Sequence, residues 1–376
     1  MTARKVPAGG CLQDGLWLSN LMEGKTYFTV FAGRRRYLSV LMVYIRPLLE
    51  QRVVDTLHLW DYARSAEDRG YLRTLEDDTL GVQVIAPPAS DHGARFPNKW
   101  KGYYAHYAAL LGTADVLIKC DDDVVFIGNL PALLSTVRRE SAGSHEQQHL
   151  LYYPSIVNND VSAVFQAADG VIKDPAYVVR LRPSIEEGRH SRTPMSDWFN
   201  CSHCARHVHG LFLENPDRFF TGCVHEWHVA ARVPINFFAM RGAAVRQHFG
   251  AYATEQFVDE PYFTALLTER TGLPSLLVSD TVVVHFAFSF QRMAGERELL
   301  ERYRKLARDR DLLARLHRRF GSRELSHSCP VSAPSALFLA RRQPPYPNAT
   351  QSRAKGRGGR KARGGRGRGA ISGLAT

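Results

Sequence analysis

Three consecutive carboxylates, Asp121, Asp122 and Asp123, stand between two apolar runs of this chain. Carboxylates in apolar surroundings repel one another and cost free energy unless a cation compensates them. Mg²⁺ and Mn²⁺ do so with oxygen ligands from one or two carboxylates, together with phosphate oxygens of a substrate. Because side chains alternate along an extended chain, we expect Asp121 and Asp123 to hold the metal. Asp122 then faces a ribose hydroxyl or the sheet.

The alternative for this acidic triplet is a solvated turn that follows a strand. The runs that flank it, VLIKC before and VVFI after, are strongly apolar. A surface loop is seldom bracketed by such runs. They therefore favour a partly buried metal site over a solvated turn.

Two later segments offer a further ligand and a base. His285 lies inside the apolar run VVVHFAF, where it is either a hydrogen-bonded core residue or a metal ligand in its neutral form. Asp259 and Glu260 precede Pro261, so they either cap the start of a helix or supply the general base for an acceptor hydroxyl. Asp259 is favoured as the base, because Glu260 is nearer the first helical position.

Basic residues follow the first two apolar runs of the chain. Arginine binds phosphate bidentately, so the Arg34–Arg36 run offers a phosphate contact, for which Arg34 is favoured. The alternative is that the three arginines form a solvated loop. Tyr62 and Arg64, after the second apolar run, are a similar secondary candidate.

A CxxC pair, Cys201 and Cys204, is followed by Cys223 and His228. Zinc prefers four nitrogen and sulfur ligands, so these residues form a candidate structural zinc site. The later pair does not have a standard spacing, and residues 205–213 also suit an amphipathic helix that needs no metal. With six cysteines in 376 residues, we do not expect a disulfide framework.

Strand and helix patterns alternate at short intervals around these residues, which predicts an α/β fold. We expect a mostly parallel sheet with helices on both faces and with ligands at the carboxyl ends of its strands. Residues 155–200 look rich in loops, and Pro47 should end or kink the first helix. The expected strands cover residues 27–32, 53–60, 82–85, 116–120, 150–153, 235–240 and 282–288. The expected helices cover 38–49, a short stretch up to 75, 100–112, 204–214, 261–269 and 294–320.

Charge and composition separate a globular body from a basic tail. Hydrophobic residues make up 44% of the chain, which excludes wholesale disorder. Residues 349–376 hold eight basic and no acidic residues, which leaves +4 of the net +12 for the rest. The tail is Arg/Gly-rich and expected to be disordered, and it carries no aromatic residues to stack on bases. We therefore expect no specific nucleic-acid partner.

Six segments, in order, carry a resemblance to a known family. They read FTVFAGRRRYLSVL, VDTLHLWDYARSAEDRGYL, KWKGYYAHY, VLIKCDDDVVFI, PINFFAMRG, and DEPYF followed by VVVHFAFSFQ. Together they span residues from about 27 to 305. They resemble nucleotide-sugar-dependent glycosyltransferases with a DxD motif and the GT-A fold, within a little-characterised group from bacteria, algae and large viruses.

This resemblance implies a Rossmann-like GT-A sheet and several site roles. It favours His285 as a third metal ligand, and it implies that Lys99 and Tyr104 contact the nucleotide or a phosphate. The tyrosines of that segment also suit core packing at helical spacing. The implied GT-A domain covers 25–322, with a donor-binding half at about 25–135 and an acceptor half at about 136–322. A lead-in at 1–24 precedes it and a tail at 323–376 follows.

The function expected from these features is a Mn²⁺- or Mg²⁺-dependent glycosyltransferase. It would move a sugar from a nucleoside-diphosphate donor, with UDP favoured, to a hydroxyl of a glycan or glycoconjugate, with inversion slightly favoured. The alternatives are a nucleic-acid-associated protein that binds through its tail, and a catalytically inactive relative that binds sugar nucleotides. We expect no transmembrane segment and a cytoplasmic location, or a Golgi or secretory one if the N-terminus is truncated.

Overall fold

The computed structural model describes residues 24–91, 100–141, 149–174, 198, 201–227, 233–288, 291–292, 295–309, 311 and 313. Residues 1–23, the tail and the greater part of residues 175–200 lie outside these residues. All of the described residues belong to one compact unit of the chain, Met1–Ala340.

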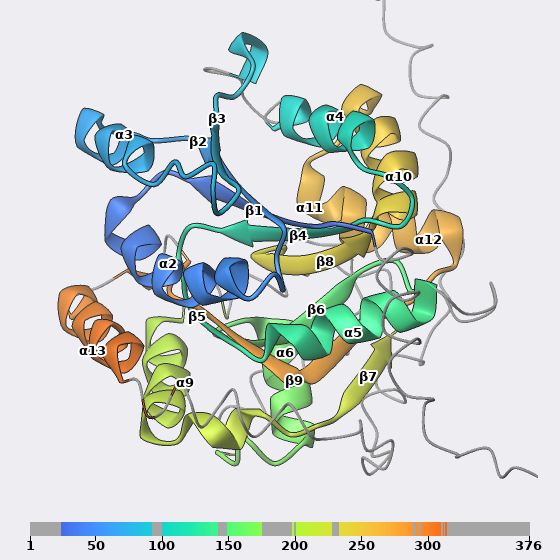
Figure 1. Ribbon diagram of the computed structural model, residues 1–376. Coiled ribbons are helices and arrows are strands. Elements are labelled where there is room, and N and C mark those ends of the chain that lie inside the picture. The colour runs from blue at the N-terminus through green and yellow to red at the C-terminus, as the bar shows by residue number, and fades with distance from the viewer. Residues whose placement is uncertain are drawn as a thin grey trace, which may run out of the picture. The chain divides into compact units, whose positions relative to one another are not determined.

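A nine-stranded mixed sheet forms the centre of this unit (Figure 1). Its strands lie in the order β3-β2-β1-β4-β8-β6-β9-β5, and β7 pairs with the early part of β9. Strands β1 to β4, β6 and β9 run in one direction, while β5, β7 and β8 run in the other. The strands are β1 (Thr26–Ala32), β2 (Thr56–Asp61), β3 (Val82–Ile85), β4 (Val116–Asp121), β5 (Val124–Gly128), β6 (Tyr152–Val157), β7 (Val224–Trp227), β8 (Phe237–Arg241) and β9 (Ser275–His285).

Helices cover both faces of the sheet, as predicted (Figure 1). Helices α4 and α10 pack together on one face, and α2 and α5 lie on the other. The helices are α2 (Arg35–Glu50), α3 (Ala66–Arg73), α4 (Lys101–Leu110), α5 (Leu130–Ser141), α6 (Asp160–Ala168), α9 (Ser202–Glu214), α10 (Gly242–Thr254), α11 (Asp259–Pro261), α12 (Leu267–Thr271) and α13 (Glu296–Arg308). Shorter turns are η1 (Ala89–Asp91), η3 (Pro216–Phe219) and the π-helical η4 (Tyr262–Leu266).

The alternation of each central strand explains why it is buried on both faces. In β1, Phe28 and Val30 alternate with Thr29 and Phe31, and the apolar side chains of both sets pack under helices. Phe31 meets the ring of Tyr103 from α4 at 4.6 Å between centroids. Phe28 packs beside Phe237 of β8. Strands covered on both sides read as continuous apolar runs, which is why the sequence revealed them.

Several elements differ from the sequence predictions. Helix α2 continues through Pro47 to Glu50, so Pro47 does not end it. Pro47 has no N–H to donate to the Val43 carbonyl four residues earlier. Val43 is 40% exposed, so water can donate a hydrogen bond to that carbonyl instead. Residues 155–200 are not all loop, because Asn159 caps a helix there by accepting a hydrogen bond from the Ser162 amide. Strand β9 also begins at Ser275, earlier than predicted.

Within the described part of the chain, no helix combines the length and the apolar character that crossing a bilayer requires.

Candidate functional site

The acidic triplet lies where strand β4 ends. Asp121 is the last residue of β4, and Asp122 and Asp123 form the turn that leads into β5. Strand β1 runs parallel to β4 with Phe31 paired to Asp121, so the residues after β1 reach the same edge of the sheet. The carboxyl ends of adjacent parallel strands are the usual ligand-binding edge of such sheets. The triplet and Arg34 therefore meet there, as the sequence predicted for strand ends.

Arg34 forms ion pairs with both turn carboxylates. Its Nε lies 3.0 Å from Asp122 Oδ1, and its Nη2 lies 2.8 Å from Asp123 Oδ2 and also contacts Asp122. The Gly33 amide donates a further hydrogen bond of 2.9 Å to Asp122 Oδ2. A side chain at position 33 would bring its Cβ to 2.8 Å from the Tyr62 carbonyl, so glycine permits this close approach.

Two further nitrogen-bearing side chains approach Asp123. His285 Nε2 lies 3.6 Å from Asp123 Oδ1, and Arg292 Nη2 lies 3.6 Å from Oδ2. Burial opposes ionisation of Asp123, but the charges of His285 and Arg34 outweigh it and hold the pKa of this carboxyl below its usual range. Burial raises the pKa of Asp122 despite its hydrogen bonds from Arg34. Asp123 is thus the carboxylate of this pair that the site keeps ionised.

Asp121 has partners of its own. It accepts a hydrogen bond from Lys119, whose side chain is almost fully buried and also donates to the Ile235 carbonyl at 2.6 Å. Asn236 Nδ2 donates to Asp121 Oδ2 at 3.1 Å. The expected alternation is therefore wrong in one respect. Arg34 contacts both Asp122 and Asp123, whereas Asp121 contacts Lys119 and Asn236, because the chain turns after Asp121 instead of staying extended.

Asp259 and Tyr104 form a buried pair. The Tyr104 hydroxyl donates to Asp259 Oδ2 at 3.0 Å, and the Glu260 amide donates to Asp259 Oδ1 at 2.9 Å. Burial raises the pKa of Asp259, the Asp121 charge adds to this, and Lys119 and Tyr104 oppose it. Glu260, the other predicted base, is half-buried. Asp259 thus both begins α11 and carries a carboxyl whose pKa is displaced towards neutrality.

A cavity of about 750 Å³ opens at the ends of β1 and β2, beside Arg34. Glu67 and Asp68 line part of it, and Glu67 pairs with Arg35 at 2.9 Å. Its positive charge comes from six arginines: Arg34, Arg35, Arg36, Arg64, Arg292 and Arg304. A concave surface with this many guanidinium groups suits a ligand that carries phosphates.

The remaining predicted site residues have mixed outcomes. Arg34 is half-buried at the triplet, whereas Arg35 and Arg36 are exposed, and the phosphate contact of Arg34 stays a prediction. Tyr104 is fully buried among Phe249, Tyr252 and Phe263, so it presents no surface to a nucleotide. The contact that the structure gives its hydroxyl is Asp259. Lys99 lies outside the described residues.

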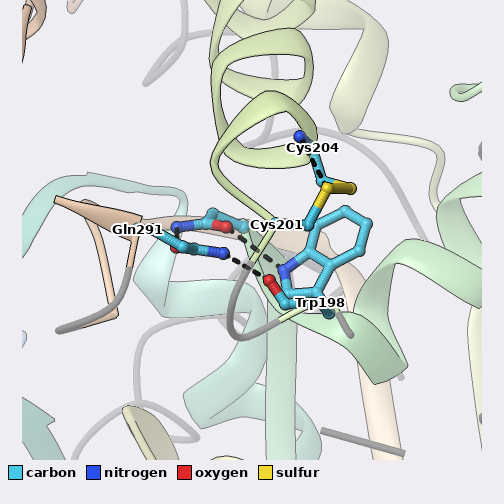
Figure 2. Close-up of a disulfide and its surroundings, with 5 residues drawn as sticks. Trp198, Cys201, Cys204 and Gln291 are labelled. Carbon is cyan, nitrogen blue, oxygen red and sulfur yellow. Dashed lines mark hydrogen bonds between the residues drawn. A yellow bond between two sulfur atoms is a disulfide. The ribbon is translucent and has the colours of Figure 1, made fainter. Parts of the chain in front are cut away.

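The cysteines do not form the candidate zinc site. Cys201 and Cys204 are joined by a disulfide (Figure 2), and Cys223 is disulfide-bonded as well. His228 lies outside the described residues. Among those that are described, Asp169, Cys223 and His225 place metal-ligating atoms within 4.8 Å of one another. Because a disulfide sulfur is not a thiolate, Cys223 cannot serve as a zinc ligand there.

Two residues of the site were not singled out from the sequence. Lys119 had a local signal, because a lysine inside the apolar run VLIKC must find a carboxylate partner if it is buried. Arg292 had none. It lies 3.6 Å from Asp123, although 169 positions separate the two residues along the chain.

Comparison with known proteins adds little. No family model matches the chain, and no curated protein matches it. Among solved structures, the chain is similar to a mycobacterial protein known from a crystal structure, with 13% identity and a TM-score of 0.32. That likeness covers 85% of this chain and 82% of the other. A similarity at this level carries no argument about fold or function.

Proposed function

We propose that this protein is a metal-dependent glycosyltransferase that uses a nucleoside-diphosphate sugar, with a UDP-sugar favoured. One observation carries the proposal: an acidic turn at the end of β4 is joined to Arg34 at the end of β1, beside a cavity of about 750 Å³ lined by arginines. Carboxylates suit a hard divalent cation, and guanidinium groups suit phosphates. A nucleoside diphosphate bound with Mn²⁺ or Mg²⁺ needs both kinds of group at one place.

The residues around the triplet fit a divalent cation chemically. Asp123 is held ionised, and His285 stands beside it. Near Asp121, the side-chain oxygen of Asn236 is buried and accepts no hydrogen bond from any described residue. Asp121, Asp123 and His285 are the residues that would hold the ion. When bound, the cation offsets the charge that develops on the leaving diphosphate.

Arginine side chains place the donor. Arg34 and Arg292 both touch Asp123 and line the cavity, so the same two guanidinium groups face the acidic turn and the phosphates. Arg64, after β2, lines the wall of the cavity beyond them. This arrangement supports a donor that lies across the ends of β1 and β2 with its diphosphate towards β4.

Asp259 is the proposed base. Burial raises its pKa, which makes it a stronger base than an exposed carboxylate, and Tyr104 fixes one of its oxygens. The acceptor oxygen attacks the anomeric carbon as its proton passes to Asp259. The bond from that carbon to the diphosphate oxygen breaks, and the electron pair leaves with the diphosphate. Attack from the face opposite the leaving group gives inversion, through an oxocarbenium-like transition state.

The sheet is compatible with the GT-A expectation. Four parallel strands, β3-β2-β1-β4, form a Rossmann-like half, and the mixed part of the sheet continues from β8. The acidic turn lies at the junction of the two, which suits a donor on one side and an acceptor on the other. The donor half predicted at 25–135 and the acceptor half predicted at 136–322 stay predictions, and β5 of the first half lies at the far edge of the mixed part.

The test is a turnover assay with a panel of UDP-, GDP- and ADP-sugars, Mn²⁺ and mixed glycan acceptors, in which release of nucleoside diphosphate is measured. We expect release from one donor class. Asp259→Asn should lower it by roughly 10²–10⁴-fold, the usual range for loss of a general base. Glu260→Gln is the matched variant and should retain most of the rate. No release from any donor, with all acceptors present, would count against the proposal.

A further inference from the structure

The Cys201–Cys204 disulfide opens helix α9, which is 13 residues long. Cys201 is the N-cap, and its sulfur accepts a hydrogen bond from the Cys204 amide at 3.1 Å. Cys201 is partly exposed while Cys204 is 3% exposed, so an external thiol reaches Cys201 first. A CxxC pair at a helix N-terminus favours the thiolate form, which makes such a pair suitable for thiol–disulfide exchange.

One connection runs from this disulfide to the candidate active site through Trp198. Figure 2 shows the indole of Trp198 beside the disulfide and its carbonyl facing Gln291. That carbonyl accepts hydrogen bonds from the Cys201 amide at 3.0 Å and from Gln291 Nε2 at 2.8 Å. The indole N–H donates to Asn158 Oδ1 at 3.2 Å, and Asn158 Nδ2 donates to Gln291 Oε1 at 2.9 Å.

A second connection runs along helix α9 itself. His209 is fully buried, and burial lowers its pKa to about 4, so it is neutral. Its Nε2 donates to the Phe286 carbonyl at 2.8 Å, and its Nδ1 accepts from the Tyr303 hydroxyl at 2.7 Å. Helix α9 therefore holds the residue that directly follows His285.

Both connections end on residues 285–288, directly behind the acidic turn. Asn158 donates to the Phe286 carbonyl at 3.3 Å, and Gln291 accepts from the Phe288 amide at 3.1 Å. The Phe286 amide in turn donates to the Asp123 carbonyl at 2.8 Å. Two routes of hydrogen bonds, one through Trp198 and one through His209, thus link the backbone beside His285 and Asp123 to the disulfide-bearing helix α9.

We propose that Cys201 and Cys204 form a reversible redox site that sets the order of residues 285–288. The co-substrate is a dithiol reductant. One of its thiolates attacks the Cys201 sulfur, the Cys201–Cys204 bond breaks, and Cys204 leaves with the electron pair and takes up a proton. The reductant's second thiol then attacks the first reductant sulfur, which is bonded to Cys201 in the mixed disulfide. Cys201 is released as a thiol, the reductant becomes a disulfide, and two electrons have passed to the protein.

Reduction makes the first turn of α9 more mobile and weakens the hydrogen bonds that order residues 285–288. The consequence for ligand binding rests on the proposed function: the reduced protein binds a Mn²⁺–nucleoside diphosphate more weakly, because His285 and Asp123 are less well placed. The expected loss is at least about fivefold in affinity, the lower end of usual couplings between sites.

The experiment compares the oxidised full-length protein with the same protein treated with dithiothreitol under native conditions. Alkylation and mass spectrometry identify the cysteines that open, hydrogen–deuterium exchange follows residues 280–288, and calorimetry measures Mn²⁺–UDP affinity. Cys223→Ser is the matched control, because dithiothreitol also acts on the disulfide of Cys223. It should keep the full response. Cys201→Ser/Cys204→Ser should exchange rapidly in both conditions.

The expected result is opening of Cys201–Cys204 in the folded protein, with faster exchange at residues 280–288. The wild-type measurements stand even if the double variant fails to fold. The proposal is overturned if the pair opens without a change in that exchange, or if it stays closed until the protein unfolds. Altered exchange together with no Mn²⁺–UDP binding in either state would support the redox site and count against the proposed glycosyltransferase.

Discussion

Arg34, two residues beyond strand β1, holds Asp122, the first residue beyond strand β4. Its Nε lies 3.0 and 3.2 Å from the two oxygens of that carboxylate. The side chains are 16% and 6% exposed, so the pair is largely removed from water. Because the same guanidinium also reaches Asp123, one cation compensates two buried acids in the turn that follows β4.

Arg34→Ala should destabilise the protein by about 3–5 kcal/mol, because it leaves two buried carboxylates without their main cation. Mn²⁺ should recover part of this loss, so the rise in Tm on adding Mn²⁺ should be larger for the variant than for the wild type. Differential scanning calorimetry with and without Mn²⁺ measures both effects. Arg35→Ala is the control, since the Arg35 side chain is 53% exposed and its pair with Glu67 should contribute under about 1 kcal/mol. Equal stability of the two variants would contradict the role given to Arg34.

Tyr104→Phe should move the acid limb of the pH–rate profile upwards. The Tyr104 hydroxyl favours ionised Asp259, whose pKa burial has already raised, so its loss raises that pKa further. Activity that depends on the ionised base then disappears at a higher pH as the solution is acidified. The measurement is kcat/KM against pH.

Tyr103→Phe is the matched control for that shift. Tyr103 is equally buried on the same helix, but its hydroxyl pairs with Thr29 at 2.7 Å instead of with Asp259. The two variants should lose similar stability, while the acid limb moves only in Tyr104→Phe. An identical limb in both variants would remove Asp259 as the titrating base.

His149→Gln should abolish a stabilisation that the wild type has in acid and neutral solution. Burial opposes the charge on His149, but Glu140 and Glu226, each 2.7 Å from a ring nitrogen, outweigh it and raise the pKa. The pKa of His149 is higher in the folded protein than the unfolded value of about 6.5, so its full contribution to stability is present below about pH 6.5. It is lost as the pH rises through the higher folded-state value.

The measurement for His149 is the Tm difference between wild type and variant from pH 5.5 to pH 9. The difference should shrink as the pH rises. Glu226→Gln should reproduce only part of the effect, because the Glu226 side chain is 45% exposed and water screens its charge. A difference that does not vary with pH would show that His149 is neutral in the folded protein.

The strands of the site were predictable because their signals are local. Strand β4 and the position of the triplet follow from the run VLIKCDDD, since a buried strand and its polar end are adjacent in sequence. The direction of each carboxylate was not predictable, because it depends on where the chain turns. The contact of Tyr104 with Asp259, 155 positions apart, depends on how α4 packs beside α11. No local pattern contains that information.

The cysteines illustrate the same limit. The sequence suggested a zinc site, with an amphipathic helix as the alternative, but the CxxC spacing of Cys201 and Cys204 suits a disulfide equally well. The folded chain decides the matter: the two cysteines are joined by a disulfide at the start of α9, with Cys201 partly exposed and Cys204 buried. The hydrogen bonds that link Trp198 and His209 to residues 285–288 arise only in the folded chain.

The central claim is that the acidic turn and the arginine-lined cavity together bind a nucleoside diphosphate with a divalent cation. The most direct measurement is the Tm of the full chain with UDP, GDP, ADP and CDP, each with Mn²⁺ and with EDTA, repeated on Asp123→Asn. We predict that at least one diphosphate raises the Tm with Mn²⁺ and not with EDTA, by the few degrees that saturation at about 100 times Kd gives. That gain should be absent in Asp123→Asn. No Mn²⁺-dependent rise with any of the four nucleotides would contradict the claim.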